Sequence, residues 1–418
     1  MEPAPGKHNE SKSACEDIIS RMPEDVISHI LDRLPIQYAV MTSILSRNWR
    51  FKWTLLSHVV FDSNFTKNLL ELKGENWCDE VNISRILLHL KGSITKFKLY
   101  IPRGTVLDVT EIDHWVMLLS RKGIKEFILI NRRIEPITLS SNFFSCVNLE
   151  HLNLSNCSLN PTPSFCGFPY LLYVSFYDVA FVNGSFGEFI SQCPLFEFLD
   201  VHSFDYDSIQ KLKSVEIAKL KNLKCFFFPL CMLDTTELTS SLVFHVLGHL
   251  SKLQTLYLDI CNCKFIRDSG TENWVRTSLS RLKTLGINPI DFGSDTMLSF
   301  VIDMIWGSPE LETLEIIGAY IDSVSQPALC ASVFNRISTA QLQLRFMKFY
   351  YFRGSENAIY LIKNLLACSP LLKEIVIHPN DCTIFSSHEK LMDAKKLLKL
   401  QLGSSAAEVN IIWTKFDY

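Results

Sequence analysis

One apolar pattern recurs eleven times along this chain of 418 residues and constrains its fold more than any other feature. Each copy reads apolar-x-x-apolar-x-apolar, and successive copies begin 22 to 33 residues apart. A further match beginning at Leu212 also fits the pattern and leaves the number of copies ambiguous in that region. The eleven copies begin at Ile94, Ile124, Leu149, Leu171, Phe196, Leu223, Leu253, Leu282, Leu311, Leu344 and Leu372.

Repeats of this length and pattern are typical of leucine-rich repeats, in which each copy supplies one short strand. The last three positions of a copy alternate apolar, variable and apolar, which places the two apolar side chains on the face opposite the variable one. Pro194, Pro309 and Pro370 each stand two residues before a copy begins, where a proline would end the preceding helix. A single repeat is stable only when it stacks on its neighbours. We therefore predict an α/β fold, a curved solenoid with a parallel sheet on its concave face.

The residues before the repeats have a different distribution of apolar side chains. Residues 1–20 contain almost no apolar residues, and we expect them to form a flexible tail. Between residues 26 and 34 the apolar residues follow one stripe of a helix. Pro35 ends that helix and opens a second, and Trp49 and Trp53 share one face of a third. Three helices this short cannot bury so many apolar side chains, so they dock on the following domain or offer an apolar face to another protein.

The stretch 22–62 resembles a plant F-box. Two departures are Met22, where the family usually has Leu, and Asn48, where a basic residue is common. The segments 144–157 and 353–377 resemble plant F-box/leucine-rich-repeat proteins that end in an FBD domain. The elements shared with the F-box are Pro23, Leu34-Pro35, Thr42-Ser43-x-Leu45-Ser46 and Trp49-Arg50-x-x-Trp53. The domain organisation that follows is a tail (1–20), a three-helix F-box (21–62), an RNI-like repeat solenoid (63–335) and FBD-like C-terminal repeats with a cap (336–418).

The resemblance implies a substrate-recognition subunit of an SCF ubiquitin ligase. In that family the F-box binds a Skp-family adaptor, which links it to a cullin and a RING subunit, and the repeats hold a protein substrate. Trp53, Leu56, Val59 and Phe61 continue apolar without a Gly/Ser linker, so we expect the F-box to dock rigidly on the first repeat. The residues that the resemblance assigns to the adaptor surface, which could alternatively only hold the helices together, are Met22, Pro23, Ile27, Ile30, Leu34, Pro35, Ile36, Val40 and Leu45.

The variable strand positions are the candidates for substrate binding on the concave face. They are chemically mixed, so no ligand class follows from them. Two alternatives therefore stay open: a receptor that needs a small-molecule ligand, and a repeat scaffold that binds partners without a ligase. The candidate residues are Asn153, Ser175, Asp200, Tyr257, Gly286, Glu315 and Lys373.

Composition excludes several other classes of function. A net charge of -3 and a pI near 6.4 give no excess of positive charge that would favour binding to nucleic acid or to a membrane surface. No apolar run approaches the roughly 18 residues of a membrane span, and the polar N-terminus lacks a secretory signal. We expect the thirteen cysteines to stay reduced, in the nucleus or the cytoplasm. The Cys261-x-Cys263 pair, with His245 and His249 upstream, has a spacing too short for a structural zinc site. No catalytic motif is present, so we expect neither an enzyme, a cofactor nor a metal.

Overall fold

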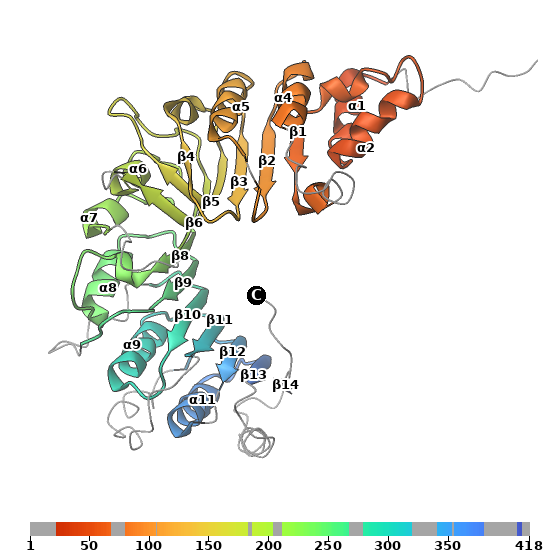
Figure 1. Ribbon diagram of the computed structural model, residues 1–418. Coiled ribbons are helices and arrows are strands. Elements are labelled where there is room, and N and C mark those ends of the chain that lie inside the picture. Colours follow the sequence, from red (N-terminus) through yellow and green to blue (C-terminus); the bar gives the residue numbers. More distant parts are fainter. Residues whose placement is uncertain are drawn as a thin grey trace, which may run out of the picture.

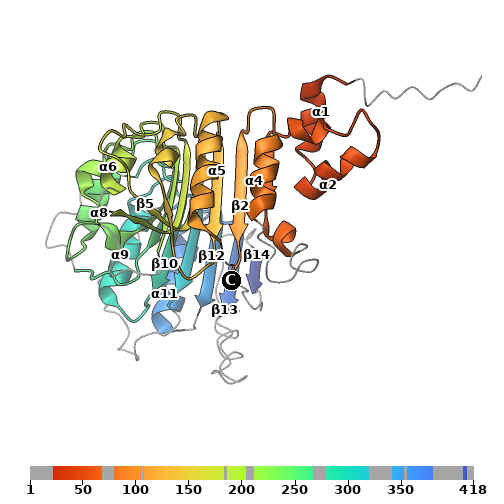
Figure 2. The ribbon, with the colours of Figure 1, turned by 45° about the horizontal axis from the view of Figure 1, so that its top comes forward.

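The computed structural model describes residues 22–67, 80–105, 107–182, 186–203, 211–266, 279–319, 341–352, 355–379 and 408–411. Within these residues, fourteen strands form one open sheet in which all the paired strands are parallel. Figures 1 and 2 show the strands on the inner side of an arc and the helices on its outer side. The strands are β1 (His58–Phe61), β2 (Lys96–Ile101), β3 (Glu126–Asn131), β4 (Ile137–Leu139), β5 (His151–Leu159), β6 (Tyr173–Phe181), β7 (Phe198–His202), β8 (Cys225–Pro229), β9 (Thr255–Asp259), β10 (Thr284–Ile290), β11 (Thr313–Gly318), β12 (Phe346–Phe352), β13 (Glu374–Pro379) and β14 (Glu408–Ile411).

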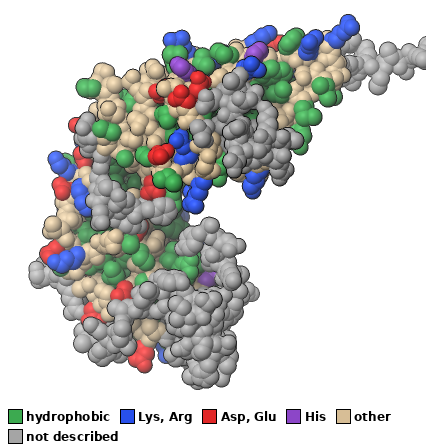
Figure 3. Space-filling model, viewed as in Figure 1, with side chains coloured by type: hydrophobic (Ala, Val, Ile, Leu, Met, Phe, Trp, Pro, Cys, Tyr) green, Lys and Arg blue, Asp and Glu red, His purple; other side chains and the backbone are tan. Residues whose placement is uncertain are grey.

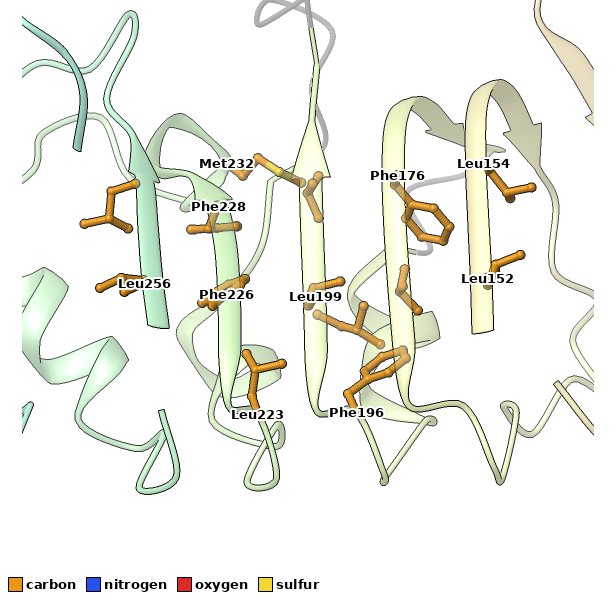
Figure 4. Close-up of a cluster of buried hydrophobic side chains, with 14 of the residues drawn as sticks. Leu152, Leu154, Phe176, Phe196, Leu199, Leu223, Phe226, Phe228, Met232 and Leu256 are labelled. Carbon is orange, nitrogen blue, oxygen red and sulfur yellow. The ribbon is translucent and has the colours of Figure 1, made fainter. Parts of the chain in front are cut away.

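The core lies between the sheet and the outer helices. Each of the eleven predicted copies supplies one strand, and all three apolar residues of every copy are buried. The middle apolar residues also pair in register, for example Phe226 with Leu256 and Leu256 with Leu285. Figure 4 shows part of this row on β5 to β9, with the side chains on one face of the sheet. Because burying a Leu or Phe contributes about 1.5–3 kcal/mol, stacking these rows stabilises the fold, and the predicted curved solenoid is confirmed.

Helices on the outer side return the chain from one strand to the next. Ser294 and Ser355 cap α9 and α11 by accepting backbone N–H groups of the first turn. Pro194, Pro309 and Pro370 follow the ends of α6, α9 and α11, as expected. None of the helices within the described residues is long and apolar enough to cross a membrane. The α-helices are α1 (Glu24–Leu31), α2 (Ile36–Met41), α4 (Glu80–His89), α5 (Val109–Arg121), α6 (Phe186–Ser191), α7 (Ser214–Ile217), α8 (Ser240–Leu247), α9 (Asp295–Trp306) and α11 (Glu356–Cys368).

The structure resolves the ambiguous match at Leu212, because residues Ser214–Ile217 form helix α7 instead of a strand. It also adds β1, β4 and β14, which the repeat pattern did not predict. Strand β4 pairs with the far end of β5, a strand of nine residues that runs past the repeat pattern to Leu159. Such pairings depend on how neighbouring repeats stack, so the repeat pattern of the sequence does not predict them.

The N-terminal module stands at one end of the arc and leads directly into the sheet (Figure 1). Its first two helices form where the sequence predicts them, but the third segment forms the 3-10 turns η2 (Thr42–Ile44) and η3 (Lys52–Leu55). Between these turns, the Ser46 hydroxyl accepts the Trp49 N–H at 3.3 Å. The expected F-box range of 21–62 includes β1, which pairs with β2. The expected tail (1–20) and most of the expected C-terminal part (336–418) lie outside the described residues.

Candidate functional site

The N-terminal module exposes part of its apolar surface. Among the predicted adaptor residues, Ile30, Leu34 and Leu45 are 40%, 38% and 69% exposed. Pro23 and Pro35 are exposed, and Met22 and Val40 are half-buried. In contrast, Ile27 and Ile36 are buried and belong to the hydrophobic core. These two residues can serve an adaptor surface only by holding the helices in place.

Sequence reasoning missed other exposed apolar residues of the same module. They lie on the outer faces of α2 and of the two 3-10 turns, opposite the buried Ile36 and Ala39. The helical spacing of α2 could have indicated Tyr38 and Met41, since each stands two positions after a buried residue of this helix. A contiguous apolar surface on a monomer marks a protein interface, and Figure 3 shows green hydrophobic patches at this end of the molecule. The missed residues are Tyr38 (54% exposed), Met41 (54%), Ile44 (78%) and Phe51 (63%).

A second candidate surface is the row of variable strand positions, which faces away from the outer helices. Six of the predicted residues occupy one continuous row across β5 to β11. Lys373 does not belong to it, because this residue precedes β13; Val376 takes the position expected for Lys373. The register adds Phe227 and Lys348, so from β5 to β13 the row reads Asn153, Ser175, Asp200, Phe227, Tyr257, Gly286, Glu315, Lys348 and Val376.

Asp200 anchors a polar cluster in this row. Its carboxylate accepts the Ser175 hydroxyl at 3.0 Å and lies 2.8 Å from the Nε2 atom of His202. The hydrogen bond to Asp200 raises the pKa of His202, and the negative charges of Asp259 and Asp178 act in the same direction, against partial burial. His202 therefore holds a proton more readily than a free histidine does.

Aromatic rings on four adjacent strands form a ladder beside this cluster. Tyr173 stacks on Phe198 at 4.1 Å between ring centroids, and Phe227 stacks on Tyr257 at 4.4 Å with the ring planes 1° apart. Phe198 and Phe227 join the two pairs at 5.7 Å. Half-buried rings of this kind provide rigid apolar contact area, which protein interfaces favour.

On the next strand, β10, the position beside Tyr257 is Gly286. A Cβ atom on Gly286 would clash with the Tyr257 ring, so only glycine lets that ring lie over β10. The Tyr257 hydroxyl reaches past this strand and donates to Glu315 at 3.0 Å. Glu315 also accepts from Lys348 at 2.7 Å. Burial and the Glu315 carboxylate raise the pKa of Tyr257, so its hydroxyl stays protonated and remains a donor.

The described cysteines offer no activated nucleophile in the core. Burial raises the pKa of Cys146, Cys157 and Cys193 to about 12, so these thiols are protonated at neutral pH. The pKa of Cys261 and that of Cys263 are also raised by burial. No group of three or more His, Cys, Asp or Glu side chains that could hold a metal ion occurs within the described residues.

Comparisons with known proteins agree with this geometry. The F-box domain model matches residues 19–59, and the model of the LRR repeats of the FBD-associated F-box protein At5g56370 matches residues 112–249. An F-box/FBD/LRR-repeat protein of Arabidopsis thaliana (At1g13570) is 26% identical over 86% of this chain and 91% of its own length. The FBD-associated F-box protein At5g38590 of Arabidopsis thaliana is 24% identical over 92% of this chain and 98% of its own length. The family models and these relatives, together with the parallel solenoid, support a plant-type F-box/FBD/leucine-rich-repeat protein.

Proposed function

We propose that this protein is the substrate-recognition subunit of an SCF (Skp–cullin–F-box) ubiquitin ligase. The observation that carries the proposal is the exposed apolar face of the N-terminal module, within the residues that match the F-box model. Leu34, Ile44 and Leu45 have no role in the core of the chain itself, and leaving them in water is unfavourable. A Skp-family adaptor would cover this face and connect the chain to a cullin and a RING subunit.

The repeat solenoid would hold the protein substrate. Its aromatic ladder and polar row offer a surface about nine strands wide on the inner side of the arc. Holding the substrate near a ubiquitin-charged enzyme raises its effective concentration, so lysine attack proceeds without a catalytic residue in this chain. We place this activity in the nucleus or the cytoplasm, where reduced thiols such as those described here persist.

Adaptor capture tests this proposal. A double substitution, Leu34→Glu and Leu45→Glu, places two charges on the exposed face without changing the buried residues. We expect it to weaken capture of a recombinant Skp-family adaptor at least about thirtyfold, the size of a hot-spot effect. The matched control is Ile134→Glu, which changes an apolar residue that is 96% exposed on the solenoid. Equal capture by the double variant, the control and the wild type would overturn the adaptor assignment.

A further inference from the structure

One carboxylate lies where the F-box meets the solenoid. Asp32 is the C-cap residue of α1, and the chain returns past it as it enters β1. Its Oδ1 atom accepts the backbone N–H groups of Ser57 and His58, both at 2.9 Å. Its Oδ2 atom accepts the Ser57 hydroxyl at 2.6 Å. Asp32, at the end of the first F-box helix, thus receives three hydrogen bonds from Ser57 and His58, the F-box residues that lead into and begin β1.

These bonds are stronger than ordinary neutral ones, because the acceptor is ionised. They also act directly before the first two strands of the sheet. Ser57 passes the connection on, since its carbonyl accepts the backbone N–H groups of Thr95 and Lys96 at the start of β2. Asp32 is therefore joined to the first two strands of the solenoid through a single residue.

The rest of the junction contains fewer polar contacts. Ser28 donates to the Leu55 carbonyl at 2.9 Å, and the Lys91 N–H donates to the Thr54 carbonyl at 2.9 Å. Between these contacts lies an open hollow of about 450 Å³. The hollow is open, and the Glu24–Lys52 ion pair at 3.8 Å lies in its lining, so side chains do not fill this side of the junction. The lining residues are Glu24, Asn48, Phe51, Lys52, Thr54, Leu55, Lys91 and Gly92.

We infer that Asp32 is a positioning residue that sets the orientation of the F-box helices α1 and α2 relative to the sheet of the repeat solenoid. Buried apolar residues such as Leu56 and Val59 keep the two parts together, but apolar contact is non-directional. The three hydrogen bonds to Asp32 are directional and select one angle. The consequence rests on the proposed function: this angle determines where a bound substrate stands relative to the ubiquitin donor.

Amide exchange and an interdomain distance test the inference together. In the full chain bound to a recombinant Skp-family adaptor, Asp32→Ala should speed exchange of the Ser57 and His58 amides by about tenfold or more. A label on the adaptor and one on an unnatural amino acid at position 134 should report a distance distribution about twice as wide. Asp32→Asn, which keeps one acceptor but loses the charge, should give intermediate values of both.

The matched control is Asp25→Ala, which removes the same charge from the exposed side of the same helix. It should leave the exchange rates and the distance distribution of the wild type unchanged. Exchange in β2 and β3 should also stay at the wild-type rate in each variant, which shows that the solenoid is folded. Should Asp32→Ala fail to fold, Ser57→Ala removes only the hydroxyl contact and is expected to widen the distribution in the same direction.

Two outcomes would overturn different statements. Unchanged exchange and an unchanged distance distribution in folded Asp32→Ala or Ser57→Ala would show that Asp32 does not set the angle. Failure of the wild-type chain to bind the adaptor would instead overturn the proposed function. In that case the exchange of Ser57 and His58 in the chain alone still decides whether Asp32 holds the junction.

Discussion

Gly286 is the residue whose identity the concave face depends on most directly. Its missing side chain leaves room for the Tyr257 ring, which in turn bonds to Glu315. Gly286→Ala should therefore displace the ring and lower the free energy of unfolding by about 1–3 kcal/mol, as overpacking does. In a Tyr257→Ala background the same substitution should cost less than about 0.5 kcal/mol, because the clash is gone. Additive costs in chemical denaturation would contradict this account of Gly286.

His202 gives the concave face a dependence on pH. Its pKa is raised above the ordinary value of 6.5, first by the hydrogen bond to Asp200 and further by the charges of Asp200, Asp259 and Asp178. A raised folded-state pKa adds stability that is fully present below the unfolded value and is lost as pH rises through the folded value. His202→Gln should therefore destabilise the protein more at pH 5.5 than at pH 9, measured by urea unfolding. Because His202 is 44% exposed, solvent screening keeps the effect small. An Asp200→Asn background should remove the difference between the two pH values; a difference of the same size there would show that another group titrates.

At the residue scale, sequence reasoning found the row of substrate candidates but not their interactions. The alternation of the repeats is sufficient to place Asn153, Ser175 and Asp200 on one face. It misplaced Lys373, which follows the first apolar residue of its copy. The variable strand position lies between the second and third apolar residues and is occupied by Val376. The same alternation also predicts Phe227 and Lys348, which were omitted from the candidates. A single repeat does not show, however, that the Phe227 ring stacks on Tyr257 or that Lys348 bonds to Glu315.

At the scale of the strand, the prediction is that alternate residues of β9 differ sharply in their contribution to stability. Leu256 is buried on the helix side of the sheet, and its neighbour Thr255 is half-buried on the other side. Leu256→Ala should cost about 2–5 kcal/mol of unfolding free energy, because it leaves a cavity in the stacked core. Thr255→Ala should cost under about 1 kcal/mol, since it changes only the pleated surface. Thermal and chemical unfolding of the two variants gives the comparison, and similar losses would mean that the register is wrong.

The repeat pattern predicts the strands that belong to the repeats. It does not predict the elements that depend on a single contact with a neighbour. Eleven strands follow from the apolar pattern, since each needs its neighbours to cover its flank. The third F-box segment shows the opposite case, because Trp49 is buried by turns instead of by a regular helix. Strand β1 belongs to the same class: its four residues are too few to show a period, and they become a strand only by pairing with β2.

The whole molecule carries the proposed adaptor surface at one end of the arc and the proposed substrate surface along its inner side. This arrangement makes simple deletion of the F-box a poor test, because removing residues 1–62 would also remove β1. Val59 and Phe61 are fully buried in that strand, so the deletion would expose the flank of β2 and damage the solenoid. Substitution of exposed residues separates the two surfaces without that damage.

The last prediction therefore uses the full-length chain with Leu34→Glu and Leu45→Glu, compared with wild type and with Ile134→Glu. For a partner found by proximity labelling with proteasome inhibition, the double variant should bind as tightly as wild type, since the concave row is unchanged. Without adaptor contact, however, the bound partner should not be ubiquitinated, so its half-life in a cycloheximide chase should lengthen several-fold. The variant should also protect the partner when wild type is present, because the two chains compete for the same substrate. If the partner decays equally fast with all three chains while binding each, the molecule is a repeat scaffold and the ligase proposal fails.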